Sequence, residues 1–201
     1  MPSVYDLKPG FQALLRPLVA RLAAVGVSAN QVTVAALVLS LAAGAAVALW
    51  PDRSWPLLLI PLVLFVRMAL NAVDGMLARE HAMQSRLGAV LNELSDVLAD
   101  AALYLPLALV PGVPSAWVVL IVLTGVIGEM TGVVAVQIGA SRRYDGPMGK
   151  SDRALWFGAI ALLLGLGISP SPWLVYVLAA MLALSAVTIA NRARRALGEV
   201  A

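Results

Sequence analysis

Long apolar runs constrain this chain more than any other feature of its sequence. Hydrophobic residues make up 61% of its 201 residues and charged residues 12%, whereas a soluble domain is usually about 45–50% apolar and about 25% charged. The runs are close to the roughly 17–25 residues that an α-helix needs to cross a bilayer. The sequence therefore predicts an all-α integral membrane protein with six transmembrane helices, near residues 32–50, 55–78, 87–110, 115–138, 154–169 and 172–190.

Residues 4–24 precede the first apolar run and mix apolar with basic side chains. One interpretation is a simple extension before the first membrane helix. The interpretation that we favour is an N-terminal amphipathic interfacial helix, which lies in the headgroup plane of the membrane lipid with its basic residues towards anionic headgroups. No internal repeat or long linker divides the chain, so we expect one membrane domain over residues 1–201.

The basic residues are distributed unevenly, because twelve of the fourteen lie on one side of the predicted membrane helices. The positive-inside rule assigns that side to the cytoplasm. We therefore expect an inner or plasma membrane protein with both termini in the cytoplasm. The net charge of +3 is small and no nucleic-acid partner is expected, while zero cysteines exclude disulfides and thiolate metal sites. The twelve residues are Lys8, Arg16, Arg21, Arg79, Arg86, Arg142, Arg143, Lys150, Arg153, Arg192, Arg194 and Arg195.

Polar residues recur at helical spacing in the second and third apolar runs. Charges at membrane depth are costly, so they indicate function by default. Carboxylate and carboxamide oxygens without His or Cys suit Mg²⁺ or Mn²⁺. The alternative is a set of interhelical hydrogen bonds without a ligand, but two anions such as Asp74 and Asp96 that converge without a cation would be strongly disfavoured. The two sets are Arg67, Asn71, Asp74 and Ala78, and then Gly88, Asn92, Asp96 and Asp100.

The same two runs hold a long motif with fixed intervals. Its residues are Asp74, Gly75, Ala78, Arg79, Gly88, Asn92 and Asp96. This pattern resembles the signature of the CDP-alcohol phosphotransferase (CDP-alcohol phosphatidyltransferase) family, D-G-x2-A-R-x8-G-x3-D-x3-D, in all its intervals and in six of its seven fixed residues. The segment from Ser28 to Thr33 is similar, more weakly, to the P-N-x-x-T segment of that family.

The resemblance implies a transferase of phospholipid synthesis. Such an enzyme moves a phosphatidyl (substituted phosphate) group from CDP-diacylglycerol or a similar CDP-lipid to an acceptor alcohol and releases CMP. The resemblance also implies one or two Mg²⁺ or Mn²⁺ ions, an active site on the cytoplasmic side and a homodimer. Two other classes stay open: a catalytically altered nucleotide-lipid binding protein and, less favoured, a small membrane transporter, although no inverted repeat is visible.

The family pattern also implies roles for individual residues. Asp96 corresponds to the last aspartate of the signature, which makes it a metal ligand or the general base that deprotonates the acceptor hydroxyl. Metal ligation is expected from Asp74, Asp96, Asn71 and Asn92. Contact with CDP is expected from Asp74, Gly75, Ala78, Arg79, Gly88 and Thr33.

Two positions depart from the family pattern, since Asn71 and Asn92 stand where the family usually has aspartates. The formal charge of the four ligands is therefore −2 instead of −4. Either the site holds one metal where relatives hold two, or it recruits a further acid. The possible compensating acids are Glu93, Asp100 and Glu129.

A second polar region lies between residues 142 and 153, and two interpretations of it stay open. It is either a basic loop that only sets the membrane topology or an acceptor pocket, which would favour an anionic acceptor such as a phosphorylated polyol. The basic residues of the possible acceptor pocket are Arg142, Arg143, Lys150 and Arg153.

Overall fold

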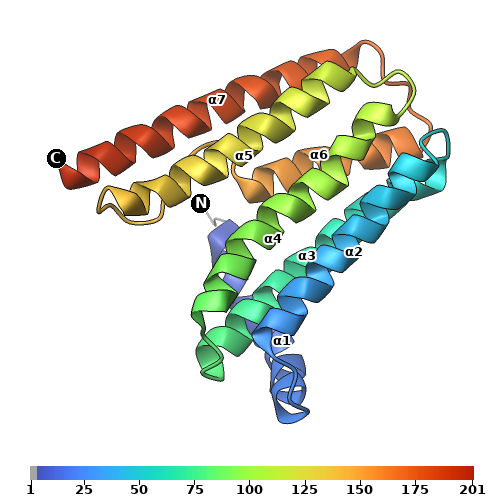
Figure 1. The fold of residues 1–201 in the computed structure, drawn as a ribbon. Coiled ribbons are helices and arrows are strands. Elements are labelled where there is room, and N and C mark those ends of the chain that lie inside the picture. Colours follow the sequence, from blue (N-terminus) through green and yellow to red (C-terminus); the bar gives the residue numbers. More distant parts are fainter. Residues whose placement is uncertain (1–3) are drawn as a thin grey trace. The chain divides into compact units, whose positions relative to one another are not determined.

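The computed structural model describes residues 4–201, with side chains from residue 10 onward, and it is built from helices (Figure 1). No strand occurs within that described part of the chain. A short 3₁₀ helix, η1 (Leu105–Leu109), follows the fourth α-helix. The α-helices are α1 (Val4–Ala24), α2 (Ala29–Leu49), α3 (Ser54–Glu80), α4 (Arg86–Tyr104), α5 (Ser115–Gln137), α6 (Lys150–Gly165) and α7 (Trp173–Val200).

Four of these helices, α2, α3, α5 and α7, are long and apolar enough to cross a membrane. The predicted all-helical class is confirmed, and each of the six predicted ranges contains a helix. The prediction of six spans is not confirmed. Helix α4 carries the acids Glu93, Asp96 and Asp100, and α6 has only 16 residues, which is short for a bilayer.

The predicted helix over residues 87–110 is interrupted near its end. Helix α4 stops at Tyr104, and η1 begins at Leu105 with Pro106 in its first positions. Proline has no N–H to donate to the preceding turn, and its ring clashes with a helical carbonyl there. The chain therefore tightens into a 3₁₀ turn, which commonly continues an α-helix over a few residues.

The chain divides into two compact units, each with its own set of contacts. The first comprises the chain up to Ala42 together with Leu62–Ala99, and the second comprises Ala43–Pro61 and Asp100–Ala201. The first unit thus contains α1, the first part of α2, the last part of α3 and most of α4.

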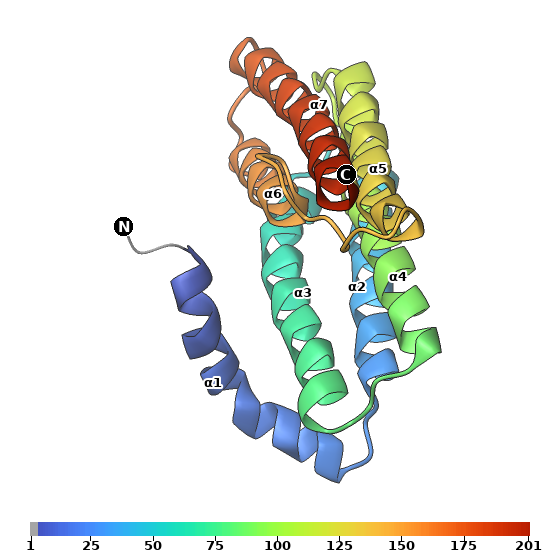
Figure 2. The same ribbon diagram turned by 90° about the vertical axis from the view of Figure 1, so that its left-hand side faces the viewer.

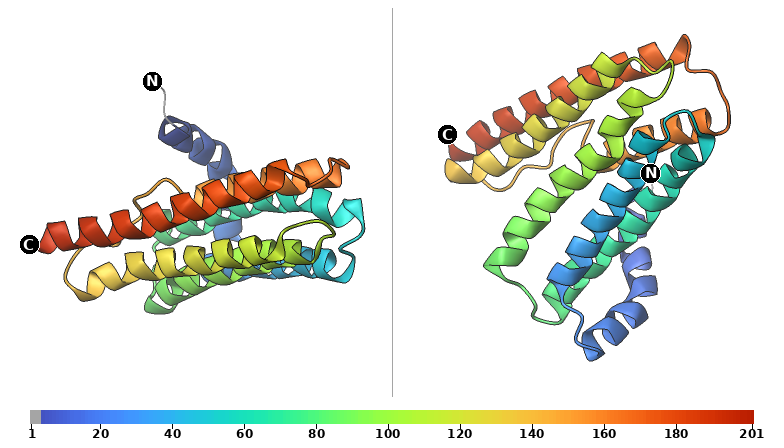
Figure 3. Two further views of the ribbon diagram at one scale, coloured as in Figure 1. Left: turned by 90° about the horizontal axis from the view of Figure 1, so that it is seen from above. Right: turned by 45° about the vertical axis from the view of Figure 1, so that its right-hand side comes forward.

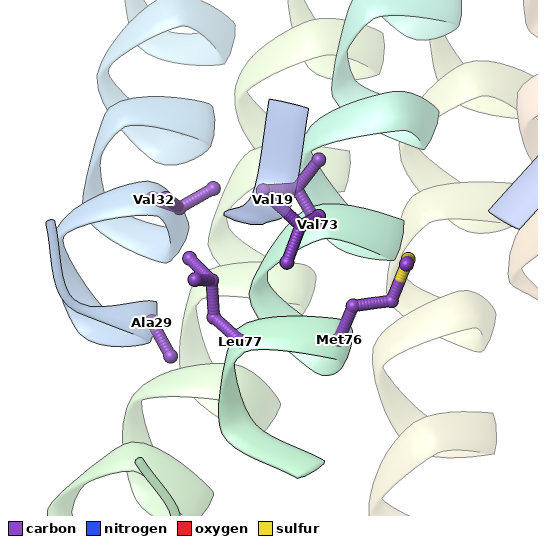
Figure 4. Packing of buried hydrophobic residues seen from close by; sticks show 6 residues of the cluster. All are labelled: Val19, Ala29, Val32, Val73, Met76 and Leu77. Carbon is purple, nitrogen blue, oxygen red and sulfur yellow. The ribbon is translucent and has the colours of Figure 1, made fainter. Parts of the chain in front are cut away.

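In the first unit, α1 packs against α2 and α3. Figure 2 shows the turn that joins α1 to α2. This turn is a Schellman motif, because the N–H of Val27 donates to the carbonyl of Leu22 and the N–H of Gly26 to that of Ala23, with Gly26 at φ +81°. Val19 of α1 is fully buried beside Val73 of α3 in an apolar cluster (Figure 4). The other members of the cluster are Ala29, Val32, Met76 and Leu77.

A surface ion pair also joins α1 to the end of α3. The guanidinium of Arg16 donates to both carboxylate oxygens of Glu80, at 3.1 and 3.0 Å. Helix α1 is therefore attached to the rest of the first unit by both apolar and charged contacts. Its location in the headgroup plane stays a prediction.

In the second unit, α5 and α7 lie side by side (Figure 3). The rings of Tyr104, at the end of α4, and Phe157 of α6 stack with their centroids 4.3 Å apart. Gly44 of α2 lies so close to Ala102 of α4 that a Cβ atom at Gly44 would collide with the carbonyl of Ala102. Small residues allow this kind of close approach between apolar helices.

We expect Gly44→Ala to destabilise the protein by about 1–3 kcal/mol, because the added methyl group forces two helix backbones apart. Thermal unfolding of the detergent-purified protein measures this change. Gly198→Ala in α7 is the matched control, since no atom lies within 4 Å of its Cβ position and alanine favours a helix over glycine. Equal stability of the two variants would contradict the close approach.

Candidate active site

The signature residues lie in the first unit, on α3 and α4. On α3, Asn71 and Asp74 are three positions apart in the sequence and therefore share a face of the helix. On α4, Asn92 and Asp96 are separated by four residues and share a face in the same way.

Asp74 is held by a residue of α2. The hydroxyl of Thr33 lies 2.8 Å from Oδ2 of Asp74, and both residues are buried, with 7% and 5% of their surface exposed. A hydroxyl that donates to a buried carboxylate restricts its orientation. Thr33 was expected to touch the cytidine of a nucleotide, which stays a prediction, whereas its contact with Asp74 could not be read from the sequence.

Asp96 receives two donors from α3. Nδ2 of Asn71 and Nη2 of Arg67 each lie 3.4 Å from Oδ1 of Asp96, and the same Nη2 donates to the backbone carbonyl of Asp96 at 3.0 Å. The side chain of Arg67 is 4% exposed and that of Asp96 is 27% exposed. The structure therefore brings Asn71 and Asp96 together, and it adds Arg67, for which the sequence suggested no specific role.

The other predicted metal ligand, Asn92, has an exposed side chain one turn before Asp96 on α4. Among the described residues, no group of three or more His, Cys, Asp or Glu side chains is arranged to hold a metal ion. The metal ligands expected from the sequence are accordingly two carboxylates and two amide oxygens. Glu93, one of the possible compensating acids, is half-buried beside Asn92.

The predicted nucleotide-binding positions show two close approaches. A Cβ atom at Gly75 would lie 3.1 Å from both terminal nitrogens of Arg79, so the guanidinium of Arg79 folds back over the small residue. A Cβ atom at Gly88 would lie 2.8 Å from Oδ1 of Asn30, which belongs to the segment from Ser28 to Thr33. Glycine at both positions therefore leaves room for a polar group. Ala78, which lies on α3, is half-buried.

The second unit contains a separate group of charges, which we call the arginine cluster: Arg142, Arg153 and Arg192 around Glu129, with Asp100. Three guanidinium groups lie 3.0, 3.1 and 3.2 Å from the carboxylate oxygens of Glu129. Arg153 also donates to Oδ2 of Asp100, at 3.0 Å. Arg192 is 1% exposed and donates to the carbonyl of Gly128 at 2.6 Å. The sequence analysis used Arg192 only as evidence of membrane topology. The signal for its burial was Glu129, because an acid within the apolar α5 indicates a buried cation nearby.

A smaller group of charges ties the loop after α5 to the end of α7. Arg143 donates to Asp145 at 2.8 Å and to Glu199 at 2.7 Å, and Arg195 donates to Asp145 at 2.6 Å. Partial burial would raise the pKa of Asp145, but the hydrogen bond from Arg143 and the charges of Arg143 and Arg195 outweigh it, so this pKa lies below its usual range.

These contacts bear on two of the sequence-based hypotheses. The three arginines of the possible acceptor pocket, Arg142, Arg143 and Arg153, each have a carboxylate of this chain beside them. Lys150, the fourth residue, is half-buried at the beginning of α6. Of the possible compensating acids, Asp100 and Glu129 already form ion pairs with arginines.

Comparison with known proteins identifies the family to which these features belong. A model of the CDP-alcohol phosphatidyltransferase family matches residues 26–190. The chain belongs to this family. The matched range contains the complete signature motif, the Thr33 hydroxyl beside Asp74 and the residues of the arginine cluster other than Arg192. The resemblance stated from the motif is thereby confirmed, and membership supports a role in phospholipid synthesis in general.

A related protein and several solved structures agree with this assignment. The chain is 48% identical over 172 residues to the inner membrane protein YnbA of Escherichia coli (strain K12). This alignment covers 85% of the chain and 82% of YnbA.

The fold of the chain is similar to that of the Mycobacterium tuberculosis phosphatidylinositol phosphate synthase PgsA1. The match to the structure with CDP-DAG bound has a TM-score of 0.71, 20% identity and coverage of 92% of each chain. The match to the complex with manganese and citrate has a TM-score of 0.72, 21% identity and coverage of 90% of this chain and 88% of that chain.

We expect Glu129→Gln to destabilise the protein by about 3–5 kcal/mol, because it removes the carboxylate that the buried Arg153 and Arg192 and the half-buried Arg142 share. Thermal unfolding in detergent measures the loss. Glu80→Gln is the control, since it breaks an exposed ion pair that contributes little to stability. A Glu129→Gln variant as stable as the parent would show that the arginine cluster is not a stabilising element.

Proposed function

We propose that this chain is a metal-dependent CDP-alcohol phosphotransferase. It would transfer a phosphatidyl group from CDP-diacylglycerol or a similar CDP-lipid to an acceptor alcohol, with release of CMP. The observation that carries the proposal is the signature motif, whose acids Asp74 and Asp96 lie in one unit with the amide of Asn71 beside Asp96. The CDP-DAG complex of the M. tuberculosis synthase, which has a similar fold, supports the choice of a CDP-lipid.

The donor set fits a hard divalent cation. Asp74, Asp96, Asn71 and Asn92 offer only oxygen ligands for Mg²⁺ or Mn²⁺. The structure of the M. tuberculosis synthase with manganese supports this choice. When bound, such an ion would neutralise the pyrophosphate of the CDP-lipid and stabilise the charge on the departing CMP. Thr33 would keep Asp74 in one orientation towards the ion, since its hydroxyl lies 2.8 Å from Oδ2.

Asp96 is the more suitable of the two acids to meet an acceptor. Its side chain is 27% exposed, whereas Asp74 is buried. In the proposed reaction, the acceptor oxygen attacks the phosphorus of the phosphatidyl group, a new P–O bond forms, and CMP departs with the electron pair of the broken bond. If Asp96 is the base, the hydroxyl proton goes to its carboxylate, and this contributes about 10²–10⁴-fold to the rate. If Asp96 is a metal ligand only, a different base must take the proton.

Nucleotide binding would use the small residues of the motif. Gly75, Ala78 and Gly88 leave space next to α3 and α4, and Arg79 would pair with a phosphate oxygen. The guanidinium of Arg79 lies over Gly75, so it must turn outward from that position to meet a phosphate. An exposed arginine side chain has the rotamer freedom to do so.

We propose that the acceptor is an alcohol. If it is anionic, a phosphorylated polyol is the expected class. Three arginines against two acids leave the arginine cluster with one positive charge in excess. This excess supports an anionic acceptor, while the presence of Glu129 among the arginines opposes it. Assays with glycerol phosphate, inositol phosphate and serine, followed by mass spectrometry of the lipid products, separate the charged from the uncharged class.

We further propose that both termini and the active site face the cytoplasm and that the protein acts as a homodimer. The uneven distribution of basic residues supports the orientation, and the family resemblance supports the dimer. A catalytically altered protein that binds nucleotide-lipid without turnover is the second candidate, because Asn71 and Asn92 replace two acids. CMP release from CDP-diacylglycerol with Mg²⁺ or Mn²⁺ distinguishes the two candidates.

We expect Asp74→Ala and Asp96→Ala each to reduce CMP release by at least about 10²-fold, because each removes a charged ligand or the base. The rate of CMP release from CDP-diacylglycerol in mixed micelles measures the effect. Asp52→Ala, at an exposed position between α2 and α3, is the control and should retain the parental rate. Near-parental turnover in either active-site variant would mean that the proposed site is wrong.

Arg79→Lys should weaken binding of the nucleotide-lipid by about tenfold. A planar guanidinium can hold two phosphate oxygens at once, and an ammonium group cannot do so with the same geometry. Titration of the protein with CDP-diacylglycerol gives the dissociation constant. Arg86→Lys, at the beginning of α4, is a control for the general effect of replacing a basic residue near the membrane surface. Unchanged affinity of Arg79→Lys would leave Arg79 with a topological role only.

A further inference from the structure

Arg67 is a buried cation among the proposed metal ligands. It lies on α3 one helical turn before Asn71 and is 3% exposed. A buried guanidinium needs an anionic or strongly polar partner, because its desolvation is otherwise costly. Its Nη2 lies 3.0 Å from the backbone carbonyl of Asp96 and 3.4 Å from the carboxylate oxygen Oδ1. The fold thus holds one positive charge permanently beside an acid of the signature.

The charge of the site changes when Arg67 is included. The four-acid signature carries −4, which two divalent ions would balance. In this chain the two carboxylates and Arg67 together carry −1. One divalent ion brings the total to +1, and a second would bring it to +3. Repulsion among like charges within several Å is large in a partly desolvated site, so the second ion is strongly disfavoured.

Asn71 belongs to the same arrangement. Its Nδ2 lies 3.4 Å from the carboxylate oxygen of Asp96 that Arg67 also approaches. An aspartate at this position would bring a second anion instead of a donor, and it would need a further cation nearby. The amide at residue 71 and the guanidinium at residue 67 therefore both compensate the charge of Asp96 without a metal.

The alternative compensation, by Asp100 or Glu129, has less support. Asp100 and Glu129 form ion pairs with Arg153 in the second unit, at 3.0 and 3.1 Å. Moving Asp100 to a metal would take one of two carboxylates from the buried Arg153, and moving Glu129 would take its carboxylate from the buried Arg192, so either move is costly. The two missing carboxylates are thus better matched by the binding of fewer metal ions than by the recruitment of Asp100 or Glu129.

We propose that Arg67 takes the place of the second divalent ion, so that the active site holds one Mg²⁺ or Mn²⁺ per chain. This inference rests on the proposed function. Asp74, Asn71, Asn92 and Asp96 remain the oxygen donors for the single ion. Arg67 would supply a fixed positive charge that stays at the site whether or not the ion is bound.

The number of Mn²⁺ ions bound to the purified full-length protein tests this proposal. Electron paramagnetic resonance of free Mn²⁺, titrated into the protein in detergent, should give one bound ion per chain. Two ions per chain, or none, would overturn the proposal. This measurement needs no variant, so it does not depend on whether a substitution at the buried Arg67 allows folding.

Two pairs of variants then test the role of Arg67 itself. Arg67→Met removes the charge at similar length and should lower the Mn²⁺ dissociation constant at least about tenfold, whereas Arg67→Lys keeps the charge and should stay within about threefold of the parent. Asn71→Asp with Asn92→Asp restores four acids, and adding Arg67→Met to this pair should tighten binding of a second ion at least about tenfold. If the affinity for the second ion is the same with and without Arg67→Met, Arg67 does not take the place of that ion.

The outcome is independent of the test of the proposed function. A parent protein that binds two Mn²⁺ ions and releases CMP overturns the role of Arg67 and leaves the transferase standing. A parent that binds one ion and releases no CMP under any metal supports the single-ion site and overturns the transferase.

Discussion

Charged side chains among apolar helices require partners of opposite charge, and this requirement explains where the buried arginines of the chain lie. Arg153 and Arg192 are 4% and 1% exposed and both contact Glu129, while Arg67 is 3% exposed and contacts Asp96. An ammonium or guanidinium group moved into a medium of low dielectric constant loses much of its hydration energy. The helices that carry these groups must therefore pack in an arrangement that brings each cation to an acid.

The two units meet this requirement with opposite balances of charge. In the arginine cluster, three guanidinium groups face two carboxylates, which leaves one positive charge in excess. At the signature, Arg67 lies beside Asp96, and together with Asp74 these groups carry one negative charge in excess. The first unit is therefore suited to a cation and the second is suited, at most, to an anion. This difference in net charge distinguishes the proposed metal site from the arginine cluster more clearly than the number of charged residues does.

The sequence predicted the helices better than their ends or their contacts. Hydropathy placed a helix in each of six ranges, because apolar content is a local property. It ended the last helix at residue 190, but α7 continues to Val200 because the polar segment after the apolar run keeps its helical pattern and buries Arg192. Helical spacing placed Asn71 and Asp74 on one face of α3, and Asn92 and Asp96 on one face of α4. The partners of Arg67 and Arg192 could not be predicted, since contacts between helices depend on rotation and register, which the periodicity of one helix does not determine.

The two asparagines of the signature are not equivalent, and their difference follows from their surroundings. Asn71 is half-buried and directs its amide nitrogen at Asp96, so its hydrogens already serve a carboxylate. Asn92 is exposed, and its carbonyl oxygen has access to a ligand from solvent or from the membrane surface. An aspartate at residue 71 would add an anion next to Asp96 and Arg67, whereas an aspartate at residue 92 would add one where water can screen it. In the proposed single-ion site, the loss of charge at Asn71 is therefore linked to Arg67, and the loss at Asn92 would change mainly the strength with which the ion is held.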